Sequence, residues 1–143
     1  MACGTRYRWW GDVKNMIRAY PELRDSMQDQ LPAAATASYG PMEPHGCAGR
    51  ALECSVVKRL SSRDTAEFKA VSHAIRDTAR MATGEARLMI IDLVYWKQSH
   101  KLYGAAMEVG YSEKQVRRYN AEFIRLVAFY LGRIPVTEVK SRR

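Results

Sequence analysis

The sequence has few of the residues that build covalent cross-links or metal centres. Cysteine occurs three times, as Cys3, Cys47 and Cys54, and histidine also occurs three times. Three cysteines are too few, and odd in number, for a disulfide framework, which favours a reducing compartment. His45, Cys47 and Cys54 lie close in sequence, but their spacing lacks the paired CxxC or HxxxH pattern of tetrahedral zinc sites. We therefore expect no disulfide framework, no bound metal and no cofactor.

Long apolar runs are also lacking. The chain has no stretch of about 18 uncharged apolar residues, the minimum for a membrane-spanning helix. Its N-terminus has no basic region followed by a long apolar run, which is the pattern of a signal peptide. The sequence therefore predicts a cytoplasmic protein with no membrane partner.

Patterns typical of enzymes are absent from the sequence as well. The histidines lie far apart, and neither a Ser/His/Asp order nor a carboxylate pair stands out. No Gly-rich phosphate loop follows a predicted strand. We expect a protein that is not an enzyme.

Basic residues, in contrast, are abundant. The chain holds 23 Lys and Arg against 15 Asp and Glu, a formal net charge of +8. From Ser99 onward there are nine Lys or Arg and four Glu, a net charge of +5. A surplus of this kind favours polyanionic partners, nucleic acid first and acidic membrane second. Most of the surplus lies in the last third of the chain.

The first 49 residues divide into a helical segment and a linker. Residues 1–30 form the N-terminal segment, in which apolar residues recur at helical spacing from Tyr7 to Gln30. Pro21 is tolerated in a first helical turn, so two helices, 7–19 and 21–30, describe the pattern equally well as one. Residues 31–49 are dominated by Ala, Pro, Gly and Ser and predict a linker.

Residues 50–134 show helical periodicity with few interruptions, which predicts an all-α fold ending in a basic tail over 135–143. Helices are expected over 50–60, from a break and cap at residues 61–64 to about Ala82, and from Glu85 through Trp96. The last of these is apolar on nearly all sides, so it is expected to be the buried centre of the domain. Asp92 within it is expected to pair with a basic neighbour or lie at an edge.

Residues Leu102 to Phe123 carry the clearest motif of the chain, a helix-turn-helix. Such a motif needs a small residue where the helices cross, a turn residue that tolerates positive φ, and an apolar residue that pins the second helix. Ala106, Gly110 and Val116 fill these positions. The sequence therefore predicts two short-linked helices at this place.

The limits of the second helix are also marked. Ser112 followed by Gln115 matches a capping box, in which two side chains satisfy exposed amides of the first turn. The helix should therefore begin near Glu113. It should end near Leu131, with Gly132 as its C-terminal cap.

Helical spacing separates the two faces of this second helix. Val116, Tyr119 and Phe123 are expected to face inward. Arginine can donate a bidentate pair of hydrogen bonds to guanine, whereas lysine supplies a point charge to phosphate. The expected DNA-facing residues are Glu113, Lys114, Arg117, Arg118 and Ala121, with Ser112 and His100 adding backbone contacts at the flanks. The alternative is an ordinary helical hairpin with a solvated basic face.

The second half of this helix is strongly apolar. Seven of its residues between Phe123 and Leu131 are large hydrophobics. Packing against the 88–96 helix is one explanation, and a self-association surface is the other, because such patches rarely stay exposed on a monomer. Since helix-turn-helix proteins commonly read two half-sites, we expect a homodimer on DNA.

The run from Tyr95 to Gly132 resembles the C-terminal region of RinA-like phage transcriptional regulators, relatives of the ArpU-like group. The linker and the N-terminal helix also resemble that family's layout. The resemblance implies a helix-turn-helix similar to the fourth region of sigma factors, which activates late genes of a phage or prophage inside the host bacterial cell. It implies that Lys114, Arg117 and Arg118 face double-stranded DNA, and it makes host RNA polymerase a candidate partner.

A rival resemblance concerns the same motif. The segment 104–115 is also similar to the helix-turn-helix of phage terminase small subunits, which bind packaging-site DNA and form rings. Those subunits usually carry the motif toward the N-terminus, whereas here it lies near the C-terminal end, which favours the regulator. A third hypothesis is a protein-interaction module. Under this hypothesis the basic face of the second helix would have no part in function.

Overall fold

The computed structural model describes residues 7–30, 61–135 and 139, and over these it contains helices and turns without a strand. The predicted all-α class is therefore confirmed. The elements are α1 (Trp9–Gln30), α3 (Ser62–Ala79), α4 (Gly84–Ile91), the π-helix η1 (Asp92–Trp96), α5 (Leu102–Val109) and α6 (Glu113–Tyr130). The expected linker 31–49, the helix over 50–60, the three cysteines and His45 all lie outside the described residues.

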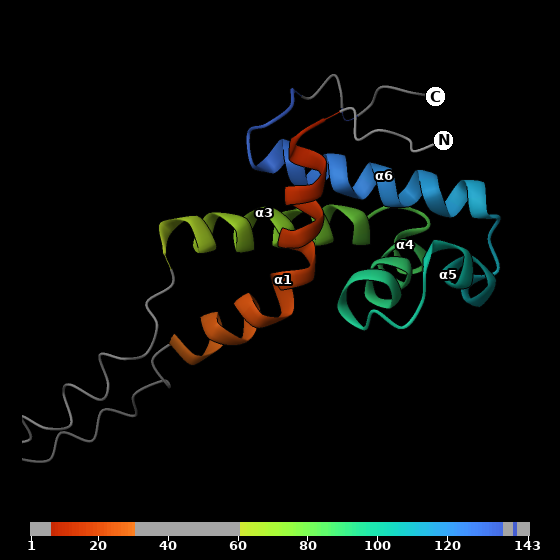
Figure 1. The fold of residues 1–143 in the computed structure, drawn as a ribbon, viewed down its shortest axis with the longest axis horizontal. Helices are drawn as coiled ribbons and strands as arrows, with labels where there is room; N and C mark the ends of the chain where they lie inside the picture. The colour runs from red at the N-terminus through yellow and green to blue at the C-terminus, as the bar shows by residue number, and fades with distance from the viewer. Residues whose placement is uncertain (1–6, 31–60, 136–138, 140–143) are drawn as a thin grey trace, which may run out of the picture.

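The main core lies where α1 crosses α3 and α6 (Figure 1). The fully buried side chains of this cluster include Val13 and Ile17 of α1, Val71 and Ala74 of α3, and Ile124 and Val127 of α6. Helix α1, which the periodicity marks off as a separate N-terminal segment, thus shares one core with the C-terminal helices. The apolar second half of α6 packs inside this core. Its partners include Ile91 and Tyr95 of the expected 88–96 helix, but they also include α1 and α3, which the prediction did not name.

A second, smaller core holds α4, η1 and α5 against the first half of α6. It consists of Ile90, Leu93, Ala105, Ala106, Val116 and Tyr119. In Figure 1 these elements lie to one side of the α1 crossing, with α5 beyond α4. This cluster fixes the angle at which α6 leaves its turn.

Pro21 lies inside α1, which is a single bent helix (Figure 1). Proline has no backbone N–H, so the carbonyl of Ile17, four residues earlier, has no helical donor. The indole Nε1 of Trp96 donates a hydrogen bond to this carbonyl at 3.0 Å. A side chain of η1 thereby supplies the bond that proline removes and ties α1 to η1.

The end of α3 and the start of α4 approach each other closely. Helix α3 begins with a complete capping box between Ser61 and Asp64, and it ends at Ala79, three residues before the expected end at Ala82. Gly84 then starts α4 so close to α3 that a Cβ at this position would lie 2.3 Å from the carbonyl oxygen of Thr78. Glycine is therefore required at this junction for steric reasons.

The expected helix from Glu85 to Trp96 forms without a break, but it does not keep one helix type and it is not buried on all sides. It changes to π-helix at Asp92, and the side chain of Met89 is 43% exposed. The expectation of a helix enclosed by the domain is therefore wrong for its outer face. Asp92 pairs with Lys97 at 2.8 Å, as expected for an acid on an apolar segment.

None of the helices in the described part of the chain has the length and apolar character needed to cross a lipid bilayer.

Candidate nucleic-acid interface

The turn between α5 and α6 has the predicted construction. Ala106 is 4% exposed where the helices cross, and Val116 is fully buried. Gly110 has a φ of 74°, the left-handed conformation that favours glycine. The amides of Gly110 and Tyr111 both donate to the carbonyl of Ala106, at 3.0 and 3.1 Å. The small, turn and pinning positions are thus all confirmed in the structure.

The N-terminus of α6 carries only half of the predicted capping box. The hydroxyl of Ser112 accepts a hydrogen bond from the backbone amide of Gln115 at 3.3 Å, and α6 begins at Glu113 as expected. The side chain of Gln115 does not return to the cap. It donates to the hydroxyl of Tyr119 at 2.7 Å instead, because Tyr119 lies one turn further along the same side of the helix.

The two faces of α6 divide largely as the spacing predicts. Val116, Tyr119 and Phe123 are buried, at 0%, 8% and 3% exposure. On the opposite face Lys114, Arg117 and Arg118 are exposed, whereas Glu113 and Ala121 are only half-buried. Ser112 is exposed at the start of the helix.

His100 stands apart from the other predicted site residues. It precedes α5, at the end of that helix remote from the turn. Its ring packs beside Gly104 and is half-buried, and its Nδ1 lies 2.8 Å from the hydroxyl of Ser99. The predicted site residues of α6 therefore lie together with Ser112. His100 lies apart from them and packs against α5.

Both arginines of the exposed face form ion pairs along α6. Arg117 pairs with Glu113, and Arg118 Nε lies 2.9 Å from Glu122 Oε1. The arginine side chains are 67% and 59% exposed. Ion pairs of this exposed i,i+4 type stabilise a helix by only about 0.5 kcal/mol. These ion pairs orient the two guanidinium groups in the absence of DNA. Because the pairs are weak, a phosphate can replace the glutamate at a small cost in free energy.

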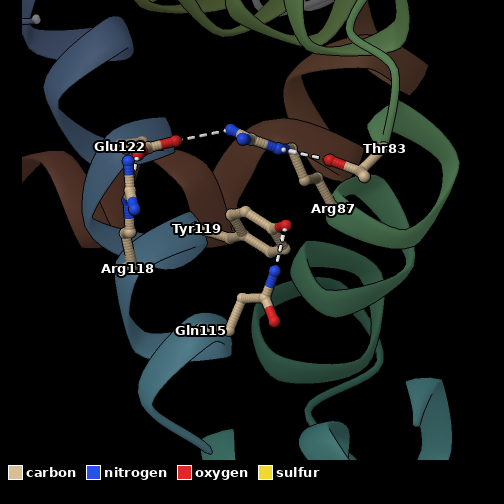
Figure 2. Close-up of polar contacts among 6 residues, drawn as sticks. All are labelled: Thr83, Arg87, Gln115, Arg118, Tyr119 and Glu122. Atoms are coloured by element: carbon tan, nitrogen blue, oxygen red, sulfur yellow. Dashed lines mark hydrogen bonds and ion pairs between the residues drawn. The ribbon is translucent and has the colours of Figure 1, made fainter. Parts of the chain in front are cut away.

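Glu122 belongs to a polar network that reaches α4 (Figure 2). Its Oε2 accepts a hydrogen bond from Arg87 Nη1 at 2.6 Å, and Arg87 Nε donates to Thr83 Oγ1 at 3.0 Å. The guanidinium of Arg87 also lies over the ring of Tyr119, 4.1 Å from its centroid. No pattern in the sequence indicates this network, because Arg87 and Glu122 are 35 residues apart.

Two further sets of basic residues were visible in the spacing but not predicted as sites. Arg125 continues the line of Lys114, Arg118 and Ala121 along one face of α6. On α3 and its C-cap the exposed residues with the same spacing are Lys69, His73, Arg76 and Arg80. Helical spacing, applied along the full length of both helices, would have identified both sets.

No family model, curated protein or solved structure matches this chain. The geometry of α5 and α6 and the exposed charges of α6 are therefore the features that bear on function.

Proposed function

We propose that this protein binds double-stranded DNA with the exposed face of α6 and acts as a transcriptional regulator of phage type. One observation carries the proposal. Lys114, Arg117 and Arg118 project from a helix whose start is fixed by the left-handed Gly110 and the Ser112 cap and whose other face is pinned in a core. A rigid helix N-terminus with exposed arginines is what major-groove recognition requires.

The chemistry of the three side chains divides the work of binding. Arg117 and Arg118 can each place two parallel donors on the O6 and N7 atoms of a guanine. Lys114 supplies a charge to phosphate without reading sequence. In the absence of DNA, Glu113 pairs with Arg117 and Glu122 pairs with Arg118.

The regulatory role is proposed from the resemblance to RinA-like regulators, with host RNA polymerase as a partner in the cytoplasm of a bacterial host. A homodimer is proposed because helix-turn-helix proteins commonly read paired half-sites. The apolar second half of α6 does not support a homodimer, because Phe123, Ile124 and Val127 are buried within the chain's own core.

The proposal is tested by selecting binding sites from a random double-stranded DNA library with the full-length protein. Binding of the selected site and of a scrambled site is then measured for Arg117→Ala and Arg118→Ala. Losing a bidentate arginine contact costs about 1–3 kcal/mol of discrimination. Thermal unfolding should change little, because substitutions of exposed side chains usually shift stability by about 0.5 kcal/mol or less.

The matched controls are Arg76→Ala and Arg80→Ala, which remove the same charge from the exposed face of α3. They should leave the affinity for both DNAs and the discrimination between them nearly unchanged, because these residues do not lie on the proposed recognition face of α6. Failure to select any sequence, or equal discrimination by all four variants, would contradict the assignment of α6. A closed ring of eight or more protomers in light scattering would favour the terminase alternative.

A further inference from the structure

Arg118 meets a carboxylate that is already engaged by a second arginine. Glu122 uses Oε1 for Arg118 at 2.9 Å and Oε2 for Arg87 at 2.6 Å. The two arginines differ in their surroundings, because the side chain of Arg87 is 17% exposed and that of Arg118 is 59% exposed. Figure 2 shows Glu122 between them, with Arg87 reaching across from α4.

Arg87 has three partners that hold its guanidinium in place. Besides Glu122, it donates to Thr83 Oγ1 at 3.0 Å and lies over the ring of Tyr119 at 4.1 Å. The hydroxyl of Tyr119 is in turn held by Gln115 at 2.7 Å. Arg118, in contrast, has Glu122 as its only hydrogen-bond partner among the described residues. When an external anion competes, Arg118 is the arginine that can leave.

The net charge of Arg87, Glu122 and Arg118 affects how the exposed face of α6 attracts a phosphate. Arg87, Glu122 and Arg118 together carry +1, so a positive charge remains for an incoming phosphate. Without Arg87 the pair of Glu122 and Arg118 is neutral. Glu122 would then both retain Arg118 and repel a phosphate close to it.

We infer that Arg87 is a positioning residue for DNA binding, which engages the Glu122 carboxylate so that Arg118 can turn to a DNA phosphate or base. This inference rests on the proposed function and assigns a role to a residue outside the α5–α6 motif. Arg87 itself does not touch the nucleic acid. It acts through Glu122, from the start of α4.

The first test is Arg87→Gln, measured by binding to a 20-base-pair DNA duplex over a range of salt concentrations. We expect affinity to fall about tenfold, and the slope of log affinity against log salt to lose about 0.9, the value of one phosphate contact. Arg87→Lys keeps a cation near Glu122 and should retain most of the affinity and the slope.

The decisive variant is the double substitution Arg87→Gln with Glu122→Gln. Removing the carboxylate leaves Arg118 without a competing anion, so affinity and salt slope should return to within about threefold and about 0.3 of the wild type. A residue needed only for packing would not be rescued in this way, because the double variant has lost both halves of the α4–α6 ion pair.

Glu85→Gln in the Arg87→Gln protein is the matched control. Like Glu122→Gln it removes one negative charge, but it does so on α4, at an exposed side chain that makes no hydrogen bond or ion pair with a described residue. Rescue by Glu122→Gln and not by Glu85→Gln supports the inference. Equal rescue by both would show that only total charge matters and would overturn it.

The remaining outcomes are separable. If the wild type binds DNA and Arg87→Gln binds with unchanged affinity and slope, the role of Arg87 is refuted while DNA binding stands. If the wild type binds no DNA, both proposals fall. If thermal unfolding shows that Arg87→Gln does not fold, Glu122→Gln alone decides, because the inference requires it to bind within about threefold of the wild type and a loss of about tenfold would contradict it.

Discussion

At the scale of single residues, Tyr95 shows how burial and one hydrogen bond set the properties of a side chain. It is 2% exposed, and its hydroxyl donates to Asn120 Oδ1 at 2.7 Å. Burial raises the pKa of this phenol above its ordinary value near 10, although the positive charge of nearby Arg18 acts in the opposite direction. The folded protein therefore favours the neutral phenol more strongly than the unfolded chain does.

This raised pKa predicts a loss of stability in alkali. Below pH 10 Tyr95 is neutral in both states, and its contribution to stability is complete. As the pH rises past 10, the unfolded chain releases the proton more easily, so the free energy of unfolding should fall until the pH passes the folded pKa. Urea unfolding between pH 7 and pH 11 measures this dependence.

Tyr95→Phe should flatten this alkaline decline. At pH 7 the substitution should also lower the free energy of unfolding by about 1–3 kcal/mol, since it leaves the buried Asn120 oxygen without its donor. Tyr103→Phe, at a side chain that is 62% exposed, is the control and should follow the wild type at every pH. An unchanged alkaline slope in Tyr95→Phe would mean that another group causes the decline.

At the scale of elements, α1 and η1 are joined by the bond between Trp96 and the carbonyl of Ile17. Trp96→Phe should lower the free energy of unfolding by about 1–3 kcal/mol, because the buried carbonyl of Ile17 loses the hydrogen bond from the indole Nε1. In a Pro21→Ala background the new backbone N–H can serve Ile17, so the same substitution should cost less. Denaturant unfolding of the four proteins forms a double-mutant cycle.

Trp10→Phe provides the control for this cycle. Trp10 packs beside the same core, and its indole has no hydrogen bond to a described residue. Its substitution should cost the same with proline or alanine at position 21. Equal costs for Trp96→Phe in the two backgrounds would show that its indole N–H does not compensate for Pro21.

The elements that local sequence determines were predicted well. Gly110, Ser112 and Gly132 mark a turn, a cap and a helix end through their own backbone preferences, and α6 begins and ends within one residue of the expected limits. The π-helix from Asp92 to Trp96 was not predicted. Its side chains contact Ile17 and Asn120, and no local pattern reports such distant partners.

The candidate site divides in the same way. Helical spacing was enough to separate exposed Lys114, Arg117 and Arg118 from buried Val116. It did not reveal Arg87, which meets Glu122 only because α4 packs beside α6. Spacing also assigned the side chain of Gln115 to the helix cap. In the folded helix it bonds to the hydroxyl of Tyr119 instead, a partner that the capping pattern does not consider.

At the scale of the whole molecule, the net charge of +8 must be separated from the charges that meet DNA. Three exposed cations, Arg63, Lys69 and Arg76, lie on α3 and not on the proposed recognition face of α6. Five exposed cations lie on α6 or in the segment between η1 and α5, namely Lys97, Lys101, Lys114, Arg117 and Arg118. If these five lie against the DNA, the phosphate charge that they neutralise determines how strongly salt weakens binding.

We therefore predict a slope of log affinity against log salt of roughly −4.5 for the full chain on duplex DNA, from the release of about five counterions. Lys114→Ala should reduce the slope by about 0.9 and weaken all DNA sequences alike, because a lysine contact to phosphate carries no sequence information. Lys69→Ala on α3 is the control and should leave the slope unchanged. Affinity that does not depend on salt would rule out a nucleic-acid partner, and an equal effect of Lys69→Ala would place the DNA over α3 as well.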